Sequence, residues 1–126
     1  MKMPVKSVQV KSILPFIGSD DYNTSRTFYK KLGFEEVWYS SSMCRFSLDG
    51  FGFYLQNAHV QDWVENTMLF LEVEDLEETL KIFKSLNLPA GFPKSRLSEI
   101  VKNDWGSEFF LHDPSGILWH IGSFNS

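Results

Sequence analysis

Apolar and polar residues alternate along several short stretches of the chain, and this pattern predicts β-strands. Asp49-Gly50 separates two of the stretches and is a strong signal for a two-residue hairpin. Asp113-Pro114-Ser115-Gly116 separates two others and fits the preferences of a type I turn. The predicted strands cover residues 12–17, 35–40, 43–48, 51–56, 68–73, 107–112 and 117–123, while residues 94–104 fit either a strand or a loop.

The chain also contains an internal repeat, visible when its two halves are aligned at an offset of 54 residues. Asp21 and Asp75 take equivalent positions, and each is placed to cap the N-terminus of a helix. Each helix carries one apolar stripe at the i, i+3, i+4, i+7 spacing, and Gly33 ends the first helix. The stripes are Ser25, Phe28, Tyr29 and Leu32 in the first copy, and Thr79, Ile82, Phe83 and Leu86 in the second.

Each half of the chain therefore has the order β-α-β-β-β, and neither half buries its sheet alone, so the two halves must share a core. We expect one domain over residues 1–126, with module one at about 12–57 and module two at about 67–124. A polar linker at 57–66 joins them. The predicted fold class is α+β, with two tandem βαβββ modules forming a cupped mixed sheet around a cleft.

Composition narrows the class of protein. Apolar residues make up 43% and charged residues 22%, as in ordinary globular domains. The net charge is −4 with no cluster of Lys and Arg, which argues against a nucleic-acid partner. No apolar run is long enough to span a membrane, and the N-terminus lacks a secretory signal pattern. The single cysteine, Cys44, permits no internal disulfide, so we expect a cytoplasmic protein.

Aromatic residues, at 16%, are the unusual part of the composition. Many stand on the predicted strands or at their ends, where a concave sheet would let them stack on flat organic ligands. Motifs for nucleotide binding or for nucleophilic catalysis are absent from the sequence. None of the three histidines, His59, His112 and His120, has a partner at metal-ligand spacing. His120 stands in the middle of a predicted strand, where burying a polar group costs free energy unless it has a partner, so it is a candidate to line a pocket.

Two segments carry a resemblance to a known family: ILPFIGSDDYNTSRTFYKKLGF at 13–34 and WGSEFFLHDPSGILWHI at 105–121. Together they resemble the glyoxalase/bleomycin-resistance/dioxygenase superfamily, also called the vicinal oxygen chelate superfamily, whose fold is built from paired βαβββ modules. The closing segment looks most like bleomycin-resistance proteins. Those antibiotic-resistance proteins have no catalytic activity and form homodimers, commonly with exchanged N-terminal strands, that sequester the drug in two clefts between the subunits.

This resemblance implies a set of ligand-binding residues. Trp105 and Gly106 would edge the cleft, and Trp38 and Phe110 would form its stacking walls. Together with other pocket-facing candidates, the expected ligand-binding residues are Trp38, Phe46, Tyr54, Met68, Trp105, Gly106, Phe110 and His120.

Metal-dependent relatives place their ligands at the positions of Leu14, Tyr54, Met68 and His120. Only His120 can bind a metal, and a site with three protein ligands cannot be assembled from it. The sequence therefore predicts no metal site, no cofactor and no catalytic residue.

The leading expectation is a non-catalytic, homodimeric protein that binds an aromatic or glycopeptide ligand, similar to bleomycin-resistance proteins. The sequence differs from those proteins in one segment: Ser40, Ser41 and Ser42 stand where those proteins carry acidic residues for a cationic drug. A metal-dependent lyase or dioxygenase with an atypical site at His120 is the alternative. An accessory module with a vestigial pocket is the third interpretation.

Overall fold

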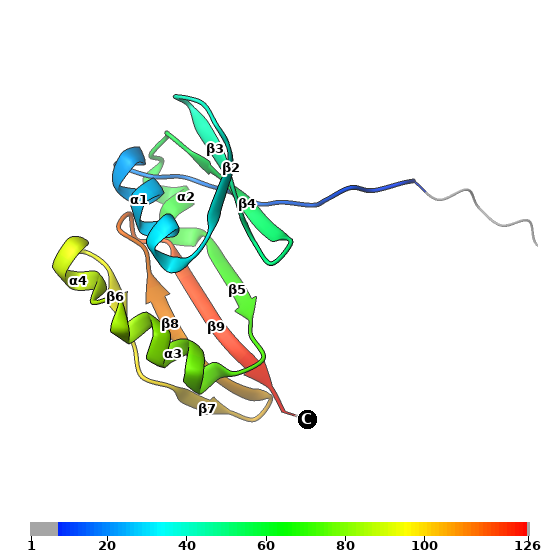
Figure 1. The fold of residues 1–126 in the computed structure, drawn as a ribbon, viewed down its shortest axis with the longest axis vertical. Helices are drawn as coiled ribbons and strands as arrows, with labels where there is room; N and C mark the ends of the chain where they lie inside the picture. The colour runs from blue at the N-terminus through cyan, green and yellow to red at the C-terminus, as the bar shows by residue number, and fades with distance from the viewer. Residues whose placement is uncertain (1–7, 126) are drawn as a thin grey trace, which may run out of the picture.

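The computed structural model describes residues 8–125, whose strands form two mixed sheets (Figure 1). Sheet A has the strand order β1-β4-β3-β2; sheet B has the order β5-β9-β8-β6, with β7 also paired to β8. The strands are β1 (Phe16–Ile17), β2 (Glu35–Tyr39), β3 (Met43–Leu48), β4 (Phe51–Gln56), β5 (Met68–Glu72), β6 (Arg96–Leu97), β7 (Val101–Asn103), β8 (Gly106–His112) and β9 (Leu118–Phe124). The helices are α1 (Tyr22–Leu32), α2 (Gln61–Asn66), α3 (Leu76–Ser85) and α4 (Leu88–Gly91).

The two modules have the same topology, which confirms the predicted α+β class and the βαβββ repeat. In each module the first strand runs parallel to the last strand, and the remaining neighbours are antiparallel. Phe16 of β1 pairs with Tyr54 of β4, and its repeat partner Phe70 of β5 pairs with His120 of β9. Residues far apart in the sequence therefore come to equivalent places on the two sheets.

Both predicted helix caps are confirmed. The Asp21 side chain accepts a hydrogen bond from the backbone of Thr24, and the Asp75 side chain accepts one from the backbone of Glu78, each at 3.0 Å. Gly33 ends α1 in the left-handed conformation, with φ of 110°.

The predicted stripe is correct for α1 and partly wrong for α3. Ser25, Phe28, Tyr29 and Leu32 are all buried. On α3, Ile82 is 49% exposed, and the buried stripe consists of Leu76, Leu80 and Phe83. Phe83 packs edge-on against Phe109 of β8, with ring centroids 6.0 Å apart, and this contact turns Ile82 toward the outside.

The predicted turns are confirmed as well. Asp49 and Gly50 both have positive φ, as a two-residue hairpin requires. The amide of Gly116 donates to the carbonyl of Asp113 at 3.0 Å and closes the type I turn. The polar linker differs from the prediction, because its second half forms α2, which the buried side chain of Val64 anchors to the protein.

The shared core lies between the modules. Tyr29 of α1 packs against Phe53 of β4, with centroids 4.8 Å apart, and Phe53 packs against Trp119 of β9 at 5.5 Å. The apolar sides of both sheets thus face one common core, together with α1 and α3. The opposite side of each sheet has no comparable cover from the described residues, and these two open sides are called face A and face B below.

Residues 8–15 lead away from the body of the protein (Figure 1). Val8, Val10 and Ile13 in this arm are 84%, 66% and 89% exposed. Residues 1–7 and 126, which fall within the predicted domain, lie outside the described residues. Within residues 8–125, no helix is long and apolar enough to cross a membrane.

Candidate functional site

Face A carries one row of side chains that crosses all four strands of sheet A. Trp38 of β2 pairs in register with Arg45 of β3, Arg45 pairs with Tyr54 of β4, and Tyr54 pairs with Phe16 of β1. The rings of Phe16 and Tyr54 are stacked, with centroids 4.9 Å apart and planes inclined by 19°. Phe16 and Trp38, at the two ends of the row, are about half exposed. Face A is therefore an aromatic strip with one cation in its middle.

Arg45 lies in the middle of this row, and its Nε atom has no polar partner there. Its guanidinium carbon lies 6.0 Å from the centroid of the Tyr54 ring. The Nε atom is buried and makes no hydrogen bond within residues 8–125. No ion pair involves Arg45 in this part of the chain, so its charge has no counterpart there.

A hollow lies at the Phe16 end of the row. Its volume is about 480 Å³, within the size range of small-molecule pockets. Trp63 of α2 and Phe16 of β1 supply its aromatic surface, and Gln56 supplies a polar group from face A. The complete lining is Phe16, Gly18, Gln56, Asp62, Trp63, Asn66 and Thr67.

Face B carries an aromatic cluster. Phe70 of β5 contacts both Trp105 and Phe124, with ring centroids 5.8 and 5.6 Å apart, and Trp105 lies 5.1 Å from Phe124. Phe70 also stacks on His120 at 6.4 Å, and Phe110 meets the other side of His120 edge-on at 5.2 Å. A hollow of about 660 Å³ opens beside Phe70 and Phe124, and Glu72 and Glu74 are among its lining residues.

His120 is the polar centre of face B, and Glu108 orients it. Its Nδ1 lies 2.7 Å from Oε1 of Glu108, and the amide of Asn103 donates to Oε2 of the same carboxylate at 2.8 Å. The Nε2 atom of His120 has no hydrogen-bond partner among the described residues. Such a histidine is positioned to donate to, accept from or exchange a proton with a bound molecule.

Two glycines allow the close packing of face B. A Cβ atom on Gly122 would lie 2.5 Å from Cζ of Phe70, so the Phe70 ring sits directly over this glycine. A Cβ atom on Gly106 would collide with the carbonyl oxygen of Ser123. Gly106, expected at the cleft edge, thus permits the close approach of two backbones where β8 begins.

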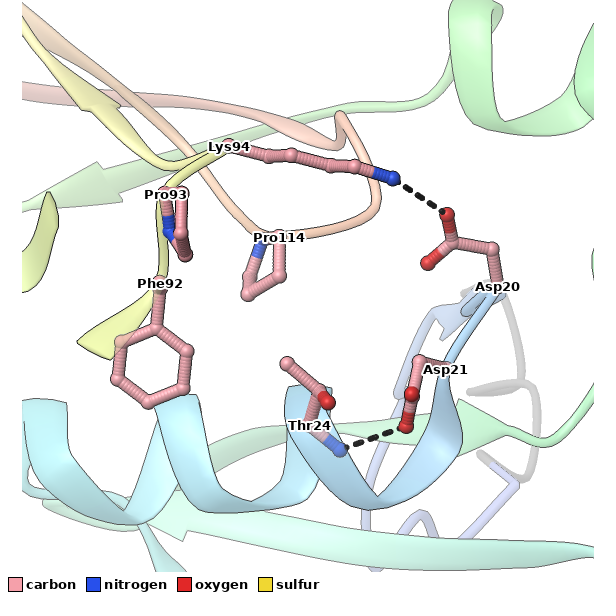
Figure 2. A pocket seen from close by; sticks show the side chains of 7 residues that line it. All are labelled: Asp20, Asp21, Thr24, Phe92, Pro93, Lys94 and Pro114. Carbon is pink, nitrogen blue, oxygen red and sulfur yellow. Dashed lines mark hydrogen bonds and ion pairs between the residues drawn. The ribbon is translucent and has the colours of Figure 1, made fainter. Parts of the chain in front are cut away.

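A separate crevice of about 320 Å³ lies where the modules meet (Figure 2). Nζ of Lys94 is 3.7 Å from Oδ2 of Asp20, and Asp21 is occupied in capping α1. Ser115 also donates to Asp20 at 2.8 Å. These charged groups pair across the crevice, which lies at the junction between the two modules.

Three of the four positions that hold a metal in related enzymes are divided between the two faces here. Tyr54 lies on face A, and Met68 and His120 lie on face B. Within residues 8–125, no group of three His, Cys, Asp or Glu side chains is placed to hold a metal ion.

The other predicted residues are divided between the two faces. Trp38 and Tyr54 lie on face A; Met68, Trp105, Phe110 and His120 belong to face B. Phe46 is fully buried on the core side of β3, because its neighbour Arg45 takes the open side, and we leave it out of both faces.

Sequence reasoning missed several residues of the two faces: Phe16, Arg45, Phe70, Glu108 and Phe124. Two signals were available. The repeat aligns Phe16 with Phe70, and counting outward from the turn at 113–116 places Glu108 and His120 on the same side of adjacent strands.

Several solved structures resemble this chain. The chain matches no protein-family profile and no curated protein. A bleomycin-binding protein from bleomycin-producing Streptomyces verticillus, solved with copper(II)-bleomycin, has a TM-score of 0.79 at 18% identity, covering 94% of this chain and 100% of that chain. A bleomycin-binding protein solved with bleomycin has a TM-score of 0.78 at 21% identity, covering 92% and 100%. A lactoylglutathione lyase from Agrobacterium tumefaciens has a TM-score of 0.69 at 15% identity, covering 90% and 94%.

These structures confirm that the chain has the fold shared by bleomycin-binding proteins and glyoxalase-like enzymes, as the resemblance in the sequence implied. At identities of 15–21% the likeness establishes the fold. The same fold carries both binding and catalysis in these neighbours, so the function of this chain must be argued from its two faces.

Proposed function

We propose that this protein is a non-catalytic binder of small molecules that acts as a homodimer, in the manner of bleomycin-resistance proteins. The observation that carries the proposal is the aromatic lining of both open faces, with Trp38 and Tyr54 on face A and Phe70 and Trp105 on face B. Aromatic walls with few polar groups are typical of sites for flat organic ligands.

In a dimer, each open face would be covered by the second copy of the chain. Exposed apolar residues gathered on one surface mark interaction sites, and here they gather on the open sides of both sheets. A two-fold arrangement that sets face A of one copy against face B of the other would form two equal clefts. Each cleft would then have Trp38 on one wall and Trp105 on the opposite wall.

The arm at residues 8–15 fits the same assembly. Val8, Val10 and Ile13 are exposed in a segment that leads away from its own body. Exchange of such a segment between two copies buries apolar side chains that one copy leaves in water. A cytoplasmic drug-sequestering role is compatible with this arrangement.

Two measurements test the proposal. Sedimentation should give a dimer, and a result of monomer alone would overturn the proposed cleft. Calorimetric titration with metal-free and copper-loaded bleomycin should give saturable binding at one drug per chain, which Trp38→Ala and Trp105→Ala should weaken. Absence of heat with either form would remove bleomycin from the candidate ligands and leave the binding of planar molecules to be tested with other aromatic compounds.

A metal-dependent lyase or dioxygenase remains the second candidate, because His120 and Glu108 are adjacent on face B and a lactoylglutathione lyase shares the fold. Two ligands of one chain fall short of the three that a catalytic zinc site uses. Elemental analysis of protein purified without chelator distinguishes the candidates. A transition metal bound at one equivalent per chain, and lost in His120→Ala, would favour the enzyme.

A further inference from the structure

Arg45 and Arg26 both belong to the first module, and they differ in whether a carboxylate pairs with the guanidinium. Arg26 donates from Nε and from a terminal nitrogen to the two carboxylate oxygens of Glu36, at 2.8 and 2.9 Å, and its guanidinium stacks on the Tyr39 ring at 3.9 Å. Arg45 has no carboxylate partner among the described residues, although its Nε is buried. In this module, therefore, the guanidinium of Arg26 has a carboxylate partner, and that of Arg45 has none among the described residues.

An acceptor for the Arg45 guanidinium would enter from the open side of sheet A. Cys44 and Phe46, the neighbours of Arg45 on β3, point into the core with no exposure, so the Arg45 side chain lies on face A. A carboxylate matches the planar donor fork of a guanidinium in two parallel hydrogen bonds. A buried Nε–H with no acceptor costs free energy, and a bound anion would recover it.

The neighbours of Arg45 indicate what carries the anion. Tyr54 lies next to it in register on one side and Trp38 on the other, and Phe16 continues the aromatic strip to the hollow beside α2. Rings on both sides of a cation provide stacking surfaces on which an aromatic ligand can lie while its acidic group meets the guanidinium. Asp62 also lines the hollow, so the acidic end would point to Arg45 and away from α2.

We propose that the ligand held on face A is an aromatic carboxylate, with its carboxylate bound by Arg45 and its ring stacked along Trp38, Tyr54 and Phe16. This inference rests on the proposed binding of small molecules by the open faces and adds the chemical class of the ligand. The only charge in the row is positive, so face A would select an anionic group at this place. The net charge of the chain is −4, so a preference for an anion would come from Arg45 and not from the charge of the whole chain.

Three probes with one ring system test the class: 2-naphthoate, 2-naphthamide and 2-naphthylmethylammonium, each titrated calorimetrically into the full chain. We expect the carboxylate to bind at least tenfold more tightly than the amide, and the ammonium to bind most weakly. Arg45→Gln should remove the preference for the carboxylate, and Arg45→Lys should restore part of it, because lysine keeps the charge and loses the fork. Arg96→Gln, which removes an exposed cation from sheet B, is the matched control and should leave the preference intact.

The outcomes separate this inference from the proposed function. Equal binding of carboxylate and amide, unchanged in Arg45→Gln, would overturn the role of Arg45 and leave small-molecule binding standing. Tighter binding of the ammonium would also overturn it. If none of the three probes binds and none raises the melting temperature, both the inference and the aromatic-binding function fall. If Arg45→Gln converts a dimer to a monomer, the partner of Arg45 is a carboxylate of the second copy, and the ligand class proposed here is wrong.

Discussion

The hydroxyl of Tyr29 on α1 donates a hydrogen bond of 2.6 Å to Oδ2 of Asp113, in the last turn of the second module. The indole nitrogen of Trp119 donates to the same hydroxyl at 2.9 Å. Tyr29 and Asp113 are fully buried, so the bonds between them cannot be replaced by water while the modules remain packed. The two halves of the repeat are therefore locked to each other by a buried polar chain as well as by apolar contacts.

Tyr29→Phe tests this junction. The substitution removes the donor to Asp113 and the acceptor of Trp119, leaving Oδ2 of Asp113 and the indole nitrogen of Trp119 without a hydrogen-bond partner. We expect the free energy of unfolding to fall by about 3 kcal/mol, since each unsatisfied group costs roughly 1–3 kcal/mol. Urea denaturation measures the loss. The control is Tyr22→Phe, whose hydroxyl donates to the carbonyl of Ser40 within the first module and whose loss should cost about 1 kcal/mol.

The pH dependence of stability gives a second prediction. Burial raises the pKa of Asp113 from 3.8 to about 6, although Tyr29, Ser115 and Ile117 donate hydrogen bonds to its carboxylate. The folded protein therefore binds more protons than the unfolded chain between pH 4 and 6, and its stability falls as the pH rises through that range.

Urea denaturation at intervals from pH 4.5 to 7 should show this slope, and Asp113→Asn should abolish it. Glu36 makes an opposite contribution at the acidic end of this range, because the hydrogen bonds from Arg26 lower its pKa from 4.5 to about 2 and its unfolded form takes up a proton first. That contribution is common to the wild-type protein and to Asp113→Asn, so the difference between the two reports Asp113. A slope of the same size in Asp113→Asn would assign the effect to another group.

Much of the fold was predictable because local chemistry determines it. Asp21 caps α1 and Asp75 caps α3 through bonds that span three residues, and Asp49-Gly50 adopts the positive φ angles that its sequence favours. Helical spacing alone does not give the direction of the apolar stripe on α3, so it places Ile82 wrongly; the contact between Phe83 and Phe109 determines which side is buried.

The binding faces were predictable only in part, since they depend on which residues come together across strands. Trp38 and Tyr54 were expected, but Arg45 between them was not, because the registers of β2 and β4 against β3 are needed to bring the three together. Phe46 was assigned to the pocket because alternation identifies two sides of a strand without saying which side is buried. Glu108 meets His120 only through the pairing of β8 with β9.

Phe70→Glu should turn the proposed dimer into a monomer. Phe70 lies in the centre of the face B cluster and is 44% exposed, so an acidic side chain there would place a charge in a desolvated interface. Sedimentation velocity measures the change. Ile82→Glu introduces the same charge at a comparably exposed site on α3 and should leave the assembly unchanged. A dimer that persists in Phe70→Glu would place the interface elsewhere.

Gly122→Ala should weaken the binding of planar ligands while the protein stays folded. The added methyl would meet the Phe70 ring at 2.5 Å, and this partly exposed ring must swing away from its stack on His120. Calorimetric titration with 2-naphthamide, which is uncharged, would measure the change. Gly91→Ala is the control, because its Cβ would contact nothing within 4 Å. Unchanged affinity in Gly122→Ala would remove Phe70 from the binding surface.

Arg45→Met should make the free protein more stable, by about 1 kcal/mol in urea denaturation. The side chain loses a charge and a buried Nε–H that lacks an acceptor, and it keeps an unbranched apolar stem between Trp38 and Tyr54. A residue that costs stability when free and gains a partner on binding is typical of a functional site. Arg26→Met should do the reverse and cost about 1–3 kcal/mol, because it leaves the largely buried carboxylate of Glu36 with only its ion pair to Lys30. If Arg45→Met instead lowers stability as much as Arg26→Met does, Arg45 is already satisfied within the protein, and no anionic ligand is needed to explain its position on face A.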